Sequence, residues 1–227
     1  MVAGLALLLA CGRDKTPSVQ TTSVHADTTA HADTMARHTV LIVGTSLTAG
    51  LGLDPDEAWP ALIQAKIDSA GLPYHVVNAG LSGETSAGAL RRIDWLLRGP
   101  VDVFVLETGA NDGLRGLDTD SLRVNIEAIL AKVHVARPTA RLALVQMEAP
   151  PNLGADYASR FRAVYPAAAK AESATLLPFL LDSVAGRPGL NQADGMHPNV
   201  AGARIVARTE WRALVPILRL PLLTESR

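Results

Sequence analysis

The chain has 227 residues, of which 48% are hydrophobic and 19% are charged, and its formal net charge at pH 7 is -1. This balance excludes the basic excess with which proteins usually bind nucleic acid or an anionic membrane surface, so a small-molecule or lipid substrate fits better. Once a polar N-terminal segment is set aside, about 190 residues remain, which is the size of one domain.

The N-terminus predicts export. An apolar run from Val2 to Ala10 precedes Cys11, and this run is too short to cross a bilayer but has the length of a signal-peptide core. The string LLACG at 8–12 resembles a bacterial lipobox, which implies a lipoprotein-type signal segment at 1–11 and lipidation of Cys11. We therefore expect a periplasmic or cell-envelope protein with a membrane-associated lipid anchor. An ordinary secretory signal or an upstream start is the alternative, because no Lys or Arg precedes the run.

Residues 12–38 are rich in Thr, Ala, His and Asp and hold almost no large apolar side chain. Such a segment buries too little surface to offset its ordering entropy, so we predict a flexible tether. The motif HADT occurs twice in it, at 25–28 and 31–34. Weak metal binding is one interpretation, but low-complexity spacing is the one we favour. The folded domain is expected at 39–220.

Short apolar runs alternate with longer segments of helical period after the tether. The first run, Thr39 to Val43, predicts a strand buried on both faces, followed by a helix that ends near Gly71. Four further strands are predicted, at His75 to Asn78, Val101 to Glu107, Leu142 to Met147 and Ala174 to Phe179. A last helix, Pro198 to Leu214, is expected to carry proline in its first turn. The alternation predicts an α/β fold, a three-layer α/β/α sandwich with a central five-stranded parallel sheet.

Ligands of open parallel sheets bind beyond the carboxyl ends of the strands, so the loops there are where chemistry is expected. Polar clusters occupy four loops, with the sequences GTSLTAG at 44–50, NAGLSGET at 78–85, GANDG at 109–113 and DGMHPN at 194–199. The glycines of the second loop let a backbone N–H approach a ligand closely. In the third loop, the Asn111 amide can donate to a developing oxyanion. Taken singly, each of these loops is also an ordinary turn.

Ser46 follows the first predicted strand at a strand-to-helix turn, where free backbone N–H groups let a nucleophile and an oxyanion site coincide. Serine is also a common helix N-cap, and that role would explain Ser46 without any reaction. The string lacks the Gly-x-Ser-x-Gly elbow because Thr48 stands in place of the second glycine. This departure counts against an α/β-hydrolase.

Asp194 precedes His197 by three residues, a spacing that lets the carboxylate fix the imidazole tautomer. A metal site is the competing interpretation. His75 and His134 stand alone in the folded region, so no third and fourth ligand accompany the pair. We therefore expect neither a metal nor an organic cofactor.

In order, the four loops resemble the blocks of the SGNH (GDSL) hydrolase superfamily, which are named for Ser, Gly, Asn and His. Residue by residue, the resemblance places the nucleophile on Ser46, the second-block glycine on Gly83, the asparagine on Asn111 and the Asp-x-x-His pair on Asp194 and His197. It implies the flavodoxin-like SGNH fold. It also implies an oxyanion hole built from the first three of these residues.

The strings AWPAL at 58–62 and NDGLRG at 111–116 are similar to the bacterial multifunctional acyl-CoA thioesterase, arylesterase and lysophospholipase subgroup. This similarity implies a serine hydrolase that cleaves a small-molecule acyl ester, an acyl thioester or a lysophospholipid. We expect the protein to be a monomer. A carbohydrate acetyl esterase on the same fold is one alternative. A non-catalytic, ligand-binding lipoprotein is the other.

One residue departs from the family signature. Thr45 stands where Gly-Asp-Ser-Leu has Asp. Because residue 45 transfers no proton in the expected scheme, the change is expected to alter hydrogen bonds around Ser46 rather than remove a catalytic step. We predict reduced or altered activity, not its loss.

Overall fold

The computed structural model describes residues 37–221. The predicted signal segment, the lipidation site Cys11 and nearly all of the predicted tether lie outside the described residues, so those expectations stay predictions. Within the described part, the first strand begins at His38, one residue earlier than expected.

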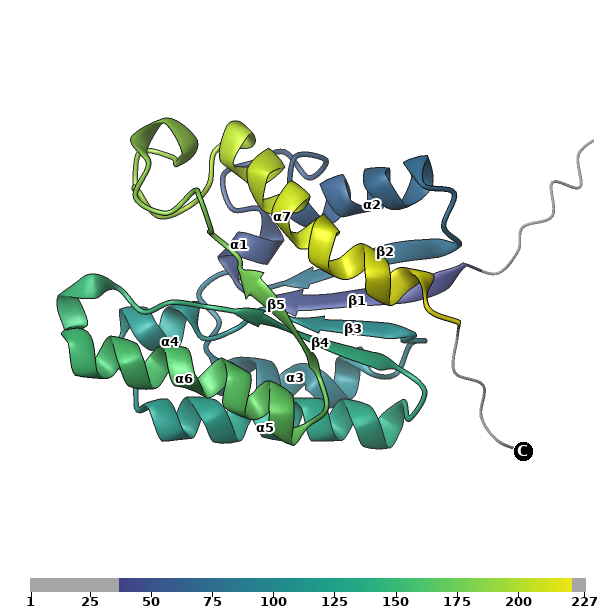
Figure 1. Cartoon of the computed structure of the whole chain (residues 1–227), viewed down its shortest axis with the longest axis horizontal. Coiled ribbons are helices and arrows are strands. Elements are labelled where there is room, and N and C mark those ends of the chain that lie inside the picture. Colours follow the sequence, from purple (N-terminus) through teal and green to yellow (C-terminus); the bar gives the residue numbers. More distant parts are fainter. Residues whose placement is uncertain (1–36, 222–227) are drawn as a thin grey trace, which may run out of the picture. The chain divides into compact units, whose positions relative to one another are not determined.

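The central sheet has five parallel strands in the order β2-β1-β3-β4-β5 (Figure 1). Their bounds are β1 His38–Gly44, β2 Tyr74–Gly80, β3 Val103–Leu106, β4 Arg141–Gln146 and β5 Thr175–Phe179. All five predicted strands and the parallel sheet are confirmed. The chain adds β2 on one side of β1 and then crosses to β3 on the other, so the strand order reverses at the carboxyl ends of β1 and β3. Ligands of such sheets bind at this point.

Helices cover both faces of the sheet. Their bounds are α1 Ser46–Ala49, α2 Trp59–Ser69, α3 Ser86–Leu96, α4 Ala110–Leu114, α5 Thr119–Ala136, α6 Ala155–Ala171 and α7 Val200–Arg219, with 3-10 turns η1 Pro151–Leu153 and η2 Pro188–Leu190. In Figure 1, α2 and α7 lie on one face of the sheet, and α3, α5 and α6 lie on the other. The predicted three-layer sandwich is therefore confirmed.

The strand sequences explain this layering. β3 reads Val-Phe-Val-Leu and all four of its side chains are buried, as are Val40 to Val43 of β1. A strand covered by helices on both faces has no solvent side, so its sequence is a continuous apolar run rather than an alternating one. Within residues 37–221, no helix combines the length and apolar character needed to cross a bilayer.

The last helix begins later than predicted. We expected Pro198 in its first turn, but α7 starts at Val200, and the Asn199 side chain caps it by accepting the Gly202 N–H at 3.0 Å. Asparagine is a preferred N-cap because its side-chain oxygen satisfies a free N–H of the first turn. Pro198 instead pairs with Asn191 in an isolated antiparallel bridge. This bridge holds the segment that precedes the helix.

Candidate active site

Ser46 is the first residue of α1 and is separated from the end of β1 by Thr45 alone. The N-cap of this helix is Thr45, whose hydroxyl accepts the Leu47 N–H, so the alternative role of Ser46 as the cap is wrong. A residue in the first turn has no acceptor for its N–H inside the helix. The Ser46 N–H is therefore available to a ligand.

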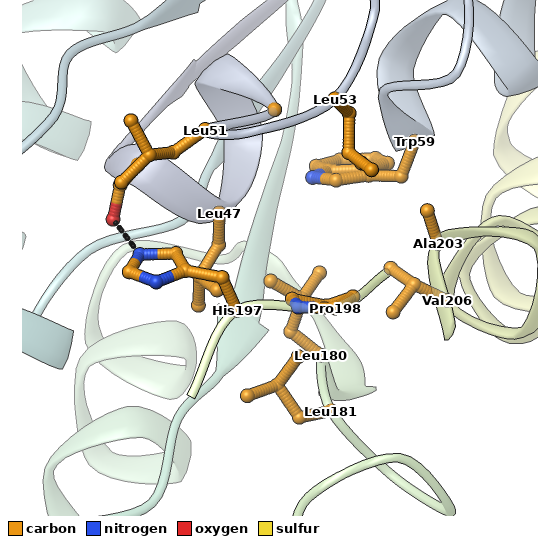
Figure 2. A pocket seen from close by; sticks show the side chains of 12 residues that line it. Leu47, Leu51, Leu53, Trp59, Leu180, Leu181, His197, Pro198, Ala203 and Val206 are labelled. Atoms are coloured by element: carbon orange, nitrogen blue, oxygen red, sulfur yellow. Dashed lines mark hydrogen bonds between the residues drawn. The ribbon is translucent and has the colours of Figure 1, made fainter. Parts of the chain in front are cut away.

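His197 lies within hydrogen-bond distance of both predicted partners. Its Nε2 atom is 2.9 Å from Ser46 Oγ, and its Nδ1 atom is 2.6 Å from Asp194 Oδ2. Figure 2 draws the Nε2 contact as a dashed line that leaves the imidazole on the side away from Pro198. The structure thus brings together the three residues that the sequence proposed as a triad.

Asp194 contacts both the ring and the backbone of His197. While Oδ2 faces the ring, Oδ1 accepts the backbone N–H groups of Met196 at 2.9 Å and of His197 at 3.0 Å. These hydrogen bonds, led by the one from the His197 backbone, lower the pKa of Asp194 to about 2. The carboxylate is therefore ionised at neutral pH, the state that stabilises an imidazolium.

Gly83 lies on the loop between β2 and α3, whereas Asn111, which the sequence placed on a loop, is the second residue of the short helix α4. Asn111 Nδ2 donates to the Glu84 carbonyl at 3.0 Å, and a primary amide has a second N–H that this bond leaves free. Gly83 has a φ of +78°, a backbone conformation that L side chains rarely adopt. A Cβ atom added there would meet nothing within 4 Å, so the backbone conformation, and not a lack of space, explains the glycine.

An ion pair that the sequence reasoning missed supports this second loop. The Arg92 guanidinium donates to both carboxylate oxygens of Glu84, with Nε 2.7 Å from Oε1 and Nη2 2.6 Å from Oε2, and also to the Ala79 carbonyl at 2.7 Å. The loop is thereby tied to α3 next to Gly83. An arginine eight residues after a loop glutamate carries no recognisable spacing signal, because the contact forms only when α3 folds back on the loop.

A second missed group is Glu107, which directly follows β3. Its carboxylate accepts the Thr45 N–H at 2.7 Å and the Thr45 hydroxyl at 3.0 Å. Thr45, the residue that departs from the family signature, is therefore hydrogen-bonded to Glu107. An acidic residue that ends a fully apolar strand is the only sequence signal that pointed to it.

An apolar pocket adjoins the reacting atoms. Figure 2 shows its wall, in which Trp59 and Leu53 lie above Pro198, Leu180 and Leu181, with His197 at one end. The remaining lining residues are Ser46, Leu47, Gly50, Leu51, Ala203 and Val206. The surroundings of Ser46 and His197 on this side are therefore mostly apolar.

The metal interpretation receives no support from the described residues. Between residues 37 and 221, no group of three or more His, Cys, Asp or Glu side chains lies close enough together to hold an ion. His75 and His134 are not among the residues that contact Asp194 or His197.

Comparison with known proteins agrees with this geometry. Residues 42–205 match the model of the GDSL-like Lipase/Acylhydrolase family. The chain is 40% identical over 181 residues to the esterase TesA of Pseudomonas aeruginosa, covering 79% of this chain and 89% of that protein. Over 181 residues it is 38% identical to thioesterase 1/protease 1/lysophospholipase L1 of Escherichia coli, covering 79% of this chain and 85% of that protein.

A solved structure extends the likeness to three dimensions. The psychrotrophic esterase EstA from Pseudoalteromonas sp., in a structure inhibited by monoethylphosphonate, matches with a TM-score of 0.76 and 34% identity, covering 81% of this chain and 100% of that one. Sequence, fold and these relatives thus point to the same group of enzymes. The chain belongs to the GDSL-like lipase and acylhydrolase family, the SGNH hydrolases.

Proposed function

We propose that this protein hydrolyses acyl esters or thioesters through a covalent acyl-enzyme on Ser46. The observation that carries the proposal is the continuous chain of hydrogen bonds from Ser46 Oγ to His197 Nε2, 2.9 Å, and from His197 Nδ1 to Asp194, 2.6 Å. A serine hydroxyl is a weak nucleophile by itself and needs such a base. Family membership supports the same chemistry.

In the acylation step, His197 Nε2 takes the Ser46 proton as Oγ attacks the acyl carbonyl. The tetrahedral intermediate then collapses, the bond to the leaving oxygen or sulfur breaks, and His197 returns the proton to the departing alcohol or thiol. Asp194 stays ionised throughout and stabilises the imidazolium. In the second half of the reaction, water takes the place of the serine and releases the acid.

The negative charge of the intermediate needs donors that are already in place. We assign this role to the backbone N–H groups of Ser46 and Gly83 and to the free N–H of the Asn111 amide. Preorganised donors of this kind contribute to rate because they point to where charge develops in the transition state. The bond between Asn111 and the Glu84 carbonyl keeps two of the three donors together.

The apolar residues beside Ser46 and His197 support a substrate class. The lining beside Ser46 and His197 is almost entirely aliphatic or aromatic, which favours acyl lipids and aryl esters over an acetylated sugar. The relatives are named an esterase and a thioesterase/lysophospholipase, in agreement with this preference. A purely ligand-binding role would leave the hydrogen bonds between Ser46, His197 and Asp194 without a purpose.

We further propose that Cys11 is the acylated first residue of a monomeric cell-envelope lipoprotein. The lipobox-like string at 8–12 and the polar segment after it support this proposal. Mass spectrometry of the native N-terminus tests it. An acylated Cys11 supports the anchor, whereas an unmodified Met1 in membrane-free protein contradicts it.

The activity is tested with p-nitrophenyl esters of increasing acyl-chain length, beside Ser46→Ala. We expect the wild type to hydrolyse them and the variant to lose this activity while it keeps its circular-dichroism spectrum. Covalent labelling with an alkylphosphonate, followed by peptide mass spectrometry, should place the label on Ser46. Hydrolysis that survives in Ser46→Ala, or a label elsewhere, contradicts the assignment.

A further inference from the structure

Glu107 is a buried carboxylate at the end of a central strand of the sheet. It directly follows β3 and has no solvent exposure, and burial raises the pKa of its carboxyl group. Among the ion pairs of residues 37–221, none involves Glu107. A buried acid without a cation must be stabilised by hydrogen-bond donors. The segments that supply these donors are therefore held next to Glu107.

The donors to Glu107 come from the turn that carries the nucleophile. They are the Thr45 N–H at 2.7 Å, the Thr48 hydroxyl at 2.8 Å and the Thr45 hydroxyl at 3.0 Å, each to Oε2. Ser46 lies between these two threonines in the chain. The turn is therefore fastened to β3 on both sides of the nucleophile.

Gly44 permits this close approach. A Cβ atom at residue 44 would lie 2.6 Å from Glu107 Oε2 and would also overlap the Thr48 hydroxyl. Any larger residue would push the carboxylate away from the turn. The glycine, the two threonines and Glu107 thus form one packed unit beneath Ser46.

We propose that Glu107 is a positioning residue. It holds the turn at 44–49 so that Ser46 Oγ stays within hydrogen-bond distance of His197 Nε2. The inference rests on the proposed function of Ser46. It also gives Thr45 a role. A hydroxyl at residue 45 donates to Glu107, whereas the aspartate of the family signature would place a second carboxylate against it. Two close carboxylates repel unless one is protonated.

Four variants separate positioning from mere stability. Thr48→Val removes one donor at constant shape, and Thr48→Ser restores it. Glu107→Gln keeps the volume but weakens the acceptor. Thr108→Val is the matched control, because Thr108 is equally buried beside Glu107 and its hydroxyl has no hydrogen-bond partner within the described chain.

The variants are measured in three ways: kcat and KM on a p-nitrophenyl ester, the rate at which an alkylphosphonate labels Ser46, and the melting temperature. Misplacing a reacting atom by about 1 Å costs up to about 100-fold in rate. We expect Thr48→Val and Glu107→Gln to lower kcat and the labelling rate about 10-fold or more, with KM within about twofold. Thr48→Ser and Thr108→Val should keep the wild-type kcat, KM and labelling rate.

The double variant Thr48→Val/Glu107→Gln should lose less than the product of the two single losses, because both changes act on the contact between Thr48 and Glu107. Unchanged kcat and labelling in both single variants overturns the proposal, as does an equal loss in Thr108→Val. If the wild type hydrolyses no ester, the labelling rate still decides: slowed labelling in Thr48→Val supports positioning while the proposed substrate class fails.

Discussion

The Asp194 carboxylate binds His197 at two places, with Oδ2 2.6 Å from the ring Nδ1 and Oδ1 3.0 Å from the backbone N–H. One acid therefore orients the imidazole and also fixes the loop that carries it. The three-residue spacing is what allows both contacts.

Replacing Asp194 should slow the reaction without unfolding the protein. An amide in Asp194→Asn can stabilise the wrong imidazole tautomer and cannot stabilise an imidazolium, so we expect kcat to fall by up to about 10⁴-fold. The measurement is kcat on a p-nitrophenyl ester at pH 7 to 8. Asp182→Asn, at an exposed aspartate on the loop after β5, serves as the control. Full activity in Asp194→Asn would mean that another group orients His197.

Asn111→Ala should reduce turnover by about 10² to 10³, the usual cost of removing one oxyanion donor. The variant also loses the bond to the Glu84 carbonyl, so a loop effect must be separated from an electrostatic one. Arg115→Ala provides this separation, because Arg115 contacts the same loop at the Gly83 carbonyl, 3.1 Å away, from an exposed position. We expect Arg115→Ala to stay within about threefold of wild type. Equal losses in the two variants would assign the effect to loop anchoring.

Breaking the Arg92–Glu84 pair should lower stability. The Glu84 side chain is only 5% exposed, so Arg92→Met leaves a nearly buried carboxylate without its cation. Removing one partner of such a pair costs about 3 kcal/mol, and urea unfolding measures it. The control is Lys132→Met, which breaks the ion pair between Lys132 and Asp94. These two side chains are 44% and 69% exposed, so the loss should cost less than about 1 kcal/mol. A smaller loss in Arg92→Met than in Lys132→Met would contradict the prediction.

Glu210 should make the protein less stable as pH rises. It is fully buried on α7, neither carboxylate oxygen has a hydrogen-bond partner within residues 37–221, and burial raises its pKa to about 8. Between the ordinary value of 4.5 and about 8, the unfolded chain releases a proton that the folded one keeps. The free energy of unfolding therefore falls through this window and levels off above it.

Glu210→Gln removes this contribution. The free energy of unfolding is measured in urea at pH 5 and at pH 8.5. Between these two pH values, the wild type should lose on the order of a few kcal/mol more of this free energy than the variant does. Taking the difference between the two proteins cancels the other titrating groups. Parallel losses would show that Glu210 is already ionised in the folded state or is reached by water.

Much of the architecture is encoded locally, and the sequence was sufficient to predict it. Runs such as Thr39 to Val43 are apolar at consecutive positions because helices cover both faces of the sheet, so the pattern alone predicts buried parallel strands. Loop chemistry is equally local. Ser46 follows its strand directly, and Asp194 reaches His197 because three residues separate them.

Other features depend on which segments pack together, and only the tertiary structure decided them. Ser46 and His197 are 151 residues apart, and the order of the strands, not any local pattern, brings them to 2.9 Å. Glu107 reaches Thr45, 62 residues away in the chain, because β3 pairs with β1. Contacts between distant segments depend on chain topology and on packing in three dimensions, which residue spacing does not record.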